Sequence, residues 1–183
     1  MMQRDGRRAL LGAVVGVWLV GCGARQRPDG GKGLLGVGAN VPALSSVDQD
    51  GAPVALAAER GHPVVVYFYP KDGTPGCTRE ACAFRDVWTR YLTAGVKVVG
   101  VSADSQSSHK KFATEHRLPF SLVADEDGLW ARSFGVSSTF GMDSRVTFLI
   151  GPDGTITHVY PDVDPGVHAE RVLGDATGTG AVQ

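Results

Sequence analysis

Two cysteines five residues apart, Cys77 and Cys82, are the side chains of this sequence best suited to covalent chemistry. A run of β-type residues ends in a loop rich in Pro and Gly, which delivers Cys77 to the start of a predicted helix. The positive end of the helix dipole and the free backbone N–H groups there favour a thiolate over a thiol. Cys77 is therefore placed to act as a nucleophile, and Cys82 offers a thiol with which an oxidised Cys77 can condense.

The spacing of the two cysteines argues against a permanent disulfide. In a regular helix, residues five positions apart point in directions about 140° apart, and their Cα atoms are roughly 8.7 Å from each other. A disulfide needs Cα atoms within about 7 Å. A bond between Cys77 and Cys82 therefore requires local unwinding, which suits a bond that forms during a reaction cycle. The structural alternative is a pair of buried free thiols.

Three further residues have the chemistry to support a reactive thiol at Cys77. Thr74, three residues earlier, carries a hydroxyl that can donate to a thiolate and accept from a hydroperoxide. Pro70 stiffens the loop and removes a competing N–H donor. Arg145, at the start of a predicted core strand, is the best candidate for a fixed positive charge.

Strand and helix patterns alternate through the middle of the chain, which predicts an α/β fold with a central mixed β-sheet flanked by helices. Continuous apolar runs predict buried strands, and apolar residues at three- and four-residue spacings predict helices. The predicted strands are 64–69, 96–101, 121–123, 145–150 and 155–160. The predicted helices are 77–94, which Gly95 ends, 105–117, 125–134 and 165–173, the last with Asp164 as N-cap.

The beginning of the chain has the features of a signal peptide. Three arginines precede an apolar run at residues 9–20, which is too short to cross a membrane as a helix. Residues 19–22, Leu-Val-Gly-Cys, resemble the lipobox of bacterial lipoprotein precursors. This resemblance implies that residues 1–21 are removed and that Cys22 carries a lipid, giving an exported protein anchored to the membrane at the periplasmic or cell-envelope face. A secretory signal with an incidental cysteine is the alternative.

One folded domain is predicted over residues 41–174, between two unstructured segments. Residues 22–40 are rich in Gly and polar residues and predict a flexible tether. Residues 175–183 are small and polar and predict a disordered tail. The formal net charge of −1 and the lack of a basic patch make nucleic acid an unexpected partner.

The segment 67–86 resembles the active-site signature of peroxiredoxins of the PrxQ type, also called bacterioferritin comigratory protein. It reads Tyr-Phe-Tyr-Pro-Lys-Asp-Gly-Thr-Pro-Gly-Cys-Thr-Arg-Glu-Ala-Cys-Ala-Phe-Arg-Asp. The similarity covers about residues 40–174 and is carried further by five shorter segments: 101–104, 108–112, 118–120, 125–128 and 145–150.

This resemblance implies a thioredoxin-like fold and a thiol peroxidase that needs no metal, haem or flavin cofactor. Carried onto this chain, Cys77 is the peroxidatic cysteine and Cys82 the resolving cysteine. Thr74 and Arg145 hold the thiolate and polarise the peroxide, and Pro70 shields the site from water. The implied partners are hydrogen peroxide or organic hydroperoxides and a thioredoxin-like dithiol reductant, and members of this type are frequently monomers.

Further expectations concern the residues around this constellation. Glu80 and Thr147 are expected to help orient the arginine. The segment 135–144 departs from the family pattern because it is shorter and less basic, so substrate preference and reductant docking depend on it. Trp88 and Trp130 are expected in the core. All five histidines are expected at the surface: His62, His109, His116, His158 and His168.

Two other functions use some of the same features. An exported copper-binding protein of the same fold would combine a cysteine pair with a downstream histidine such as His158 or His168, but such proteins use a Cys-x3-Cys spacing. A peroxide sensor that passes its oxidation to a partner protein would use Cys77 and Cys82 as they stand.

Overall fold

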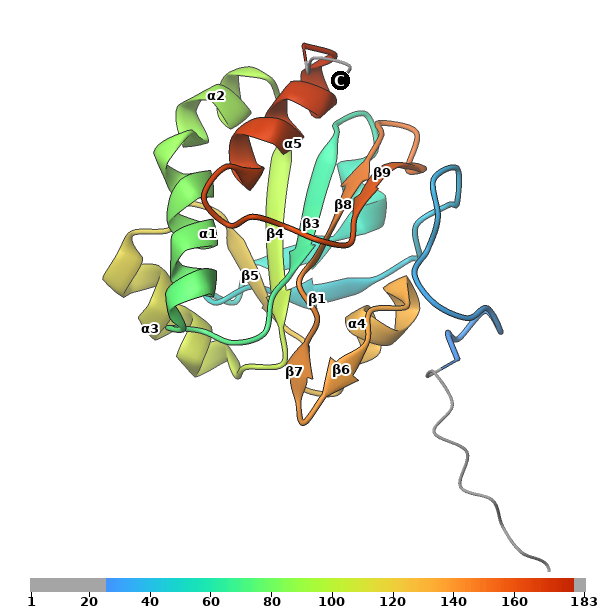
Figure 1. Ribbon diagram of the computed structural model, residues 1–183, viewed down its shortest axis with the longest axis horizontal. Helices are drawn as coiled ribbons and strands as arrows, with labels where there is room; N and C mark the ends of the chain where they lie inside the picture. Colours follow the sequence, from blue (N-terminus) through green and yellow to red (C-terminus); the bar gives the residue numbers. More distant parts are fainter. Residues whose placement is uncertain (1–25, 180–183) are drawn as a thin grey trace, which may run out of the picture.

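A five-stranded mixed β-sheet forms the centre of the computed structural model, which describes residues 26–179 (Figure 1). Its strand order is β5-β4-β3-β8-β9, in which β3, β4 and β5 are parallel and β8 and β9 run antiparallel to their neighbours. The strands are β3 (Val64–Phe68), β4 (Lys97–Ser102), β5 (Ser121–Ala124), β8 (Val146–Ile150) and β9 (Ile156–Tyr160). The predicted α/β class and the mixed sheet are confirmed.

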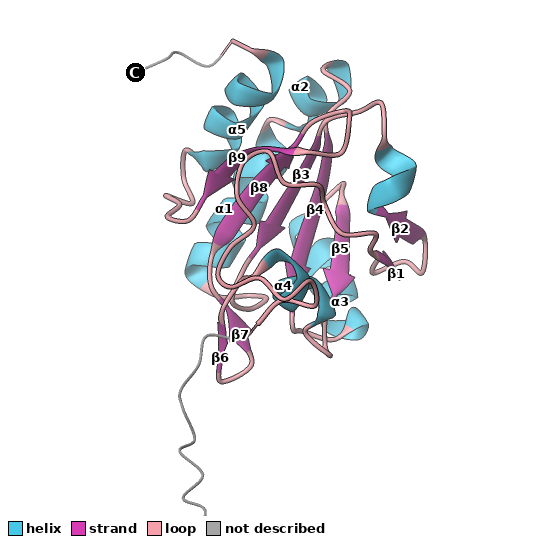
Figure 2. Cartoon of the chain, turned by 90° about the vertical axis from the view of Figure 1, so that its right-hand side faces the viewer, coloured by secondary structure: helices cyan, strands magenta, loops and turns pink. Residues whose placement is uncertain are grey.

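Helices cover both faces of this sheet because the side chains of its strands alternate between two cores. Val65, Tyr67 and Tyr69 pack with residues of α1, α2, α3 and α5, whereas Val64 and Val66 pack with residues of α4. Figure 1 and Figure 2 show these helices on the two faces of the sheet. The helices are α1 (Pro75–Asp86), α2 (Trp88–Thr93), α3 (Gln106–His116), α4 (Leu129–Phe134) and α5 (His168–Thr177).

The helix expected over 77–94 is interrupted at Val87, whose backbone (φ −103°, ψ 11°) separates α1 from α2. After this interruption Tyr91 enters the core, and its hydroxyl donates to the carbonyl of Ala169 at 2.8 Å. Trp88 is only partly buried, whereas Trp130 lies in the core as expected. The interruption thus turns the second segment so that it packs against α5.

Several short elements were not predicted, because two to four residues carry too little periodicity to be recognised. They are β1 (Ser45–Val47), β2 (Pro53–Ala55), the 3-10 helix η1 (Leu56–Glu59), β6 (Ser138–Thr139) and β7 (Met142–Asp143). After β1, the amide side chain of Gln49 donates to the carbonyl of Phe120 at 3.2 Å and accepts from the N–H of Leu122 at 2.7 Å. These bonds satisfy backbone groups at the edge strand β5.

The folded part of the chain begins earlier than residue 41. Leu35 is buried, and its N–H donates to the carbonyl of Phe134 at 2.9 Å. Gly38 donates to the carbonyl of Ile156 at 2.8 Å. Residues 35–40 therefore pack on the domain, and the prediction of a tether is wrong for them. The predicted leader 1–21 and the lipidated Cys22 lie outside the described residues.

The last helix is also displaced from its prediction. Residues 165–167 form a turn in which the Asp164 carboxylate accepts from the N–H of Gly166 at 2.9 Å, and α5 begins only at His168. The helix continues to Thr177 because the hydroxyl of Tyr160 donates to Asp175 at 2.6 Å and Ala176 packs on the core. The prediction of disorder is therefore wrong for residues 175–177. Within residues 26–179, no helix has both the length and the apolar character needed to span a membrane.

Candidate active site

Cys77 is the third residue of α1 and is almost fully buried. Strand β3 ends at Phe68, and the loop that follows turns through Gly73 (φ +70°) into Thr74, whose extended backbone precedes the first helical residue, Pro75. Amides in the first turn of a helix have no partner within the helix. The sequence therefore places the Cys77 sulfur beside free N–H groups and the positive end of a twelve-residue helix.

Arg145 reaches Cys77 because of the way β8 pairs with β3. In this antiparallel pair Val146 lies opposite Phe68, so Arg145 stands at the end of the sheet where the active-site loop begins. Its Nη2 donates to the Sγ of Cys77 at 3.2 Å. The contact joins residues 68 positions apart in the sequence and sets a positive charge beside the sulfur.

Glu80 holds the other end of this guanidinium group. Its carboxylate oxygen Oε2 accepts from Nη1 of Arg145, and the side chain is fully buried. Burial raises the pKa of Glu80 to about 7, because removal of water from the carboxylate outweighs the attraction of Arg145. Burial alone would lower the pKa of Arg145, but Glu80 and Cys77 together raise it. Glu80 is thus the orienting carboxylate that was expected from the sequence.

Thr147 does not orient the arginine, and this expectation is wrong. Thr147 is the second residue of β8, and its Oγ1 bonds to the Nε2 of His168 at 2.8 Å. His168 is itself buried, contrary to the expectation for an exposed histidine. Burial lowers the pKa of His168 to about 4, with the charges of Arg171 and Arg145 contributing, so it is neutral at physiological pH.

Thr74 and Pro70 lie in the loop between β3 and α1. The Thr74 hydroxyl donates to the carbonyl of Lys71 at 3.1 Å, so its proton stabilises the loop in this conformation. Its oxygen lone pairs stay available as acceptors. Pro70 is half-buried and lies two residues beyond the end of β3.

Cys82 is a free thiol, like Cys77, and is half-buried on the same helix. It lines a groove of about 320 Å³ between α1 and the start of α5. The other lining residues are Arg79, Ala83, Asp86, Val87, Gly166, Ala169 and Glu170. The two thiols therefore lie in one regular helix with no bond between them, as their spacing predicts for the reduced protein.

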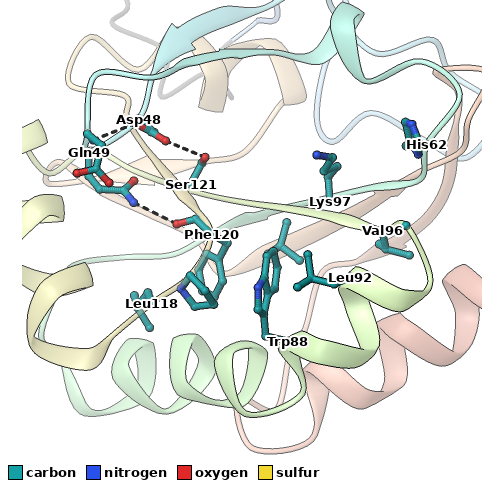
Figure 3. Close-up of a pocket in the computed structure, with 14 residues that line it drawn as sticks. Asp48, Gln49, His62, Trp88, Leu92, Val96, Lys97, Leu118, Phe120 and Ser121 are labelled. Atoms are coloured by element: carbon teal, nitrogen blue, oxygen red, sulfur yellow. Dashed lines mark hydrogen bonds between the residues drawn. The ribbon is translucent and has the colours of Figure 1, made fainter.

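A larger hollow of about 630 Å³ lies away from these residues (Figure 3). Trp88 and Leu92 from α2 border it, together with Phe120 and Lys97 at the amino-terminal ends of β5 and β4. Cys77 instead follows the carboxyl-terminal end of β3, so volume alone does not identify the reactive site. Within residues 26–179 there is no group of three His, Cys, Asp or Glu side chains that could hold a metal ion.

Comparisons with known proteins show which family the chain resembles. A sequence model of the AhpC/TSA family matches residues 37–159. The chain is 44% identical over 139 residues to peroxiredoxin Q of Sedum lineare chloroplasts, covering 74% of this chain and 75% of that protein. It is 41% identical over 145 residues to a putative peroxiredoxin bcp of Coxiella burnetii, covering 75% and 96%. The match to the wheat (Triticum aestivum) peroxiredoxin Q covers 60% of that longer protein.

Solved structures give the same result for the fold. Peroxidoxin BcpB of Mycobacterium tuberculosis superposes with a TM-score of 0.72 at 33% identity, covering 78% of this chain and 96% of that one. Peroxiredoxin Q of Xanthomonas campestris superposes with a TM-score of 0.71 at 35% identity, covering 78% and 97%. The predicted thioredoxin-like fold is therefore confirmed.

Proposed function

The chain belongs to the AhpC/TSA family and is a peroxiredoxin of the Q type, a thiol-dependent peroxidase, and on this premise we propose a reaction path through Cys77 and Cys82. Cys77 is the peroxidatic cysteine, and Cys82 resolves its sulfenic acid as an intramolecular disulfide. The observation that carries the proposal is the 3.2 Å contact from Arg145 to the Cys77 sulfur at the start of a helix. A guanidinium group and free amides around one sulfur favour the thiolate that the reaction requires.

In the first step the Cys77 thiolate attacks the distal oxygen of a hydroperoxide, in line with the O–O bond. A sulfur–oxygen bond forms and the O–O bond breaks. The bonding pair leaves with the second oxygen as an alkoxide or hydroxide, which takes a proton and departs as alcohol or water. Arg145 and the first-turn amides stabilise the charge that spreads along the breaking bond. The Thr74 hydroxyl oxygen accepts a hydrogen bond from the hydroperoxide and so orients it, and Pro70 limits access of water.

In the second step the start of α1 unwinds and Cys82 attacks the sulfenic sulfur of Cys77. Water leaves and a disulfide forms. Unwinding is required because the two Cα atoms of a regular helix would stay about 8.7 Å apart. A thioredoxin-like dithiol protein then reduces the disulfide and is itself oxidised. The open groove beside Cys82 supports access by such a partner.

The proposed substrates are hydrogen peroxide and organic hydroperoxides. A Xanthomonas campestris bacterioferritin comigratory protein described for its alkyl peroxide reduction activity shares 34% identity and a TM-score of 0.72 with this chain, which supports the organic class. We propose that the protein acts as a monomer.

We also propose that the enzyme works outside the cytoplasm, anchored by a lipid on Cys22. The support is the Leu-Val-Gly-Cys sequence at residues 19–22 behind an apolar run. Metabolic labelling with a fatty acid should mark the wild-type protein and not the Cys22→Ala variant. Labelling that persists in the variant would refute the anchor.

The reaction path is tested with two cysteine variants and a dithiol reductant. Cys77→Ser protein should consume no peroxide above the uncatalysed rate. Cys82→Ser protein should reduce one equivalent and then stop or over-oxidise, because its sulfenic acid has no partner. Peroxide consumption by Cys77→Ser at the wild-type rate would refute the role of Cys77, and sustained turnover by Cys82→Ser would refute that of Cys82.

A further inference from the structure

A buried polar network joins the active-site loop to helix α3, outside the contacts of Cys77 and Arg145. Its centre is the carboxylate of Asp72, in the loop between β3 and α1. Oδ1 of Asp72 accepts from the hydroxyl of Tyr69 at 2.8 Å. Oδ2 accepts from the hydroxyl of Ser108 at 2.7 Å and contacts Nδ1 of His109 at 2.9 Å. We call these residues the Asp72 network, together with Asp104, which binds the Asp72 backbone, and Ser102, which binds Asp104.

The backbone of Asp72 is held as firmly as its side chain. Its N–H donates to Oδ2 of Asp104 at 2.8 Å, and the same oxygen accepts from the Ser102 hydroxyl at 2.9 Å. Ser102 ends β4, and Asp104 lies between β4 and α3. Asp72 is therefore held both by α3 and by the segment that follows β4.

His109 connects this network to the backbone of β5. The side chain is fully buried, Nδ1 faces Asp72 and the Tyr69 hydroxyl, and Nε2 faces the carbonyl of Val123 at 3.2 Å. Each ring nitrogen therefore has a polar partner, so the buried ring is satisfied on both sides. Burial alone would raise the pKa of Asp72, but the hydrogen bonds from His109, Ser108 and Tyr69 lower it. Asp72 and His109 thus form a buried, hydrogen-bonded pair.

The side chains that α3 contributes to this network form hydrogen bonds with the active-site loop and not with α3 itself. Ser108 and His109 are neighbours on α3, and both bind Asp72, which lies 36 and 37 positions earlier in the chain. An ordinary buried histidine would need only a local acceptor to be satisfied. Here the charged partner lies two residues after Pro70 and two before Thr74.

We propose that His109 is a positioning residue for the peroxidase reaction: through Asp72 it fixes the loop that carries Pro70 and Thr74 at the start of α1. This inference rests on the proposed function of Cys77. The Asp72 network holds the side of the site that faces the peroxide, so that the Thr74 hydroxyl and the first-turn amides keep their places relative to the sulfur. A displacement of about 1 Å in such a site costs on the order of a hundredfold in rate.

The test compares two reactions of Cys77 in the reduced full-length protein. Single-turnover reaction with hydrogen peroxide depends on the oriented loop, whereas alkylation by iodoacetamide at the same pH needs only the thiolate. His109→Gln and Asp72→Asn should slow the peroxide reaction by about tenfold to a hundredfold and change alkylation by less than about twofold. His116→Gln, on the same helix and outside the Asp72 network, is the control and should match the wild type in both reactions.

Three results would overturn the positioning role. One is a wild-type peroxide rate in folded His109→Gln protein, and another is a parallel fall of the peroxide and alkylation rates, which indicates general damage. Where loss of the buried Asp72–His109 pair prevents folding, Ser108→Ala decides: it removes one donor to Asp72 and should slow the peroxide reaction about threefold. An unchanged rate in that variant is the third contrary result. Failure of the wild-type Cys77 to react with peroxide would instead count against the proposed function.

Discussion

Replacement of Glu80 by Gln should change how the stability of the protein depends on pH. The buried carboxyl group of Glu80 has its pKa raised from an ordinary value of 4.5 to about 7. Between these values the folded protein binds more protons than the unfolded chain, so stability falls as pH rises through this window. Gln has nearly the same shape, its amide oxygen can still accept from Arg145, and it does not titrate.

The size of the effect follows from the shift. At about 1.4 kcal/mol for each pKa unit, a rise from 4.5 to about 7 corresponds to about 3 kcal/mol. The free energy of unfolding of the wild type, relative to that of Glu80→Gln, should therefore decrease by about 3 kcal/mol between pH 4.5 and pH values above 7. Subtracting the two profiles cancels the other titrating groups, because both proteins contain them.

Urea unfolding of the reduced proteins, followed by tryptophan fluorescence at several pH values, measures this difference. Glu170→Gln is the matched control, because Glu170 forms an exposed ion pair with Arg90 on the protein surface. The difference in free energy of unfolding between Glu170→Gln and the wild type should vary little with pH. If the difference in free energy of unfolding between Glu80→Gln and the wild type stays constant from pH 4.5 to 8, the argument that burial raises the pKa of this carboxyl group is refuted.

Two further substitutions test other parts of the site. Gly76→Ala places a Cβ 3.3 Å from Nη2 of Arg145, so the guanidinium group must move by a few tenths of an ångström. The rate of reaction with peroxide should therefore fall about threefold to tenfold. The free energy of unfolding should rise by up to about 1 kcal/mol, because Ala has a higher helix propensity than Gly. Equal peroxide rates in Gly76→Ala and the wild type would show that Arg145 can move by this amount without loss of activity. The free energy of unfolding of the wild type should fall by about 3 kcal/mol as pH drops from 6.5 to about 4, because the pKa of His168 is lowered in the folded protein. His168→Gln should remove this loss, whereas the exposed control His158→Gln should not. Urea unfolding at several pH values again measures the difference.

The central strands and the start of α1 could be predicted because their signals are local. Val64–Phe68 is a continuous apolar run, Val146–Ile150 is apolar except for Thr147, and each is buried on both faces of the sheet. Pro75 at the first helical position marks the beginning of the helix that carries Cys77. The meeting of Arg145 with Cys77 depends on strand register; the place of Arg145 at the start of a core strand made it a candidate, and the family resemblance supported that choice.

The buried histidines could not be predicted in the same way. His109 lies in a polar segment of α3, and the carboxylate that makes its burial tolerable is 37 positions away. His168 likewise depends on Thr147, which a β-strand presents from the centre of the sheet. By contrast, the apolar pair Leu34-Leu35 in a Gly-rich segment was a local signal that residues before 41 join the core.

The two sides of the site differ in what holds them, and the difference matches the proposed cycle. Besides Cys77, the only apolar side chain buried between Cys77 and Cys82 is that of Ala81, so unwinding this stretch exposes little apolar surface. Unwinding also returns Glu80 to water, and above pH 7 this offsets part of the cost because burial disfavours its charged form. Phe84, fully buried one turn further along, keeps the rest of α1 in place. The segment that the proposed disulfide must open therefore buries little apolar surface and is held mainly by the contacts of Arg145 with Cys77 and Glu80, while the loop before it is fixed by the Asp72 network.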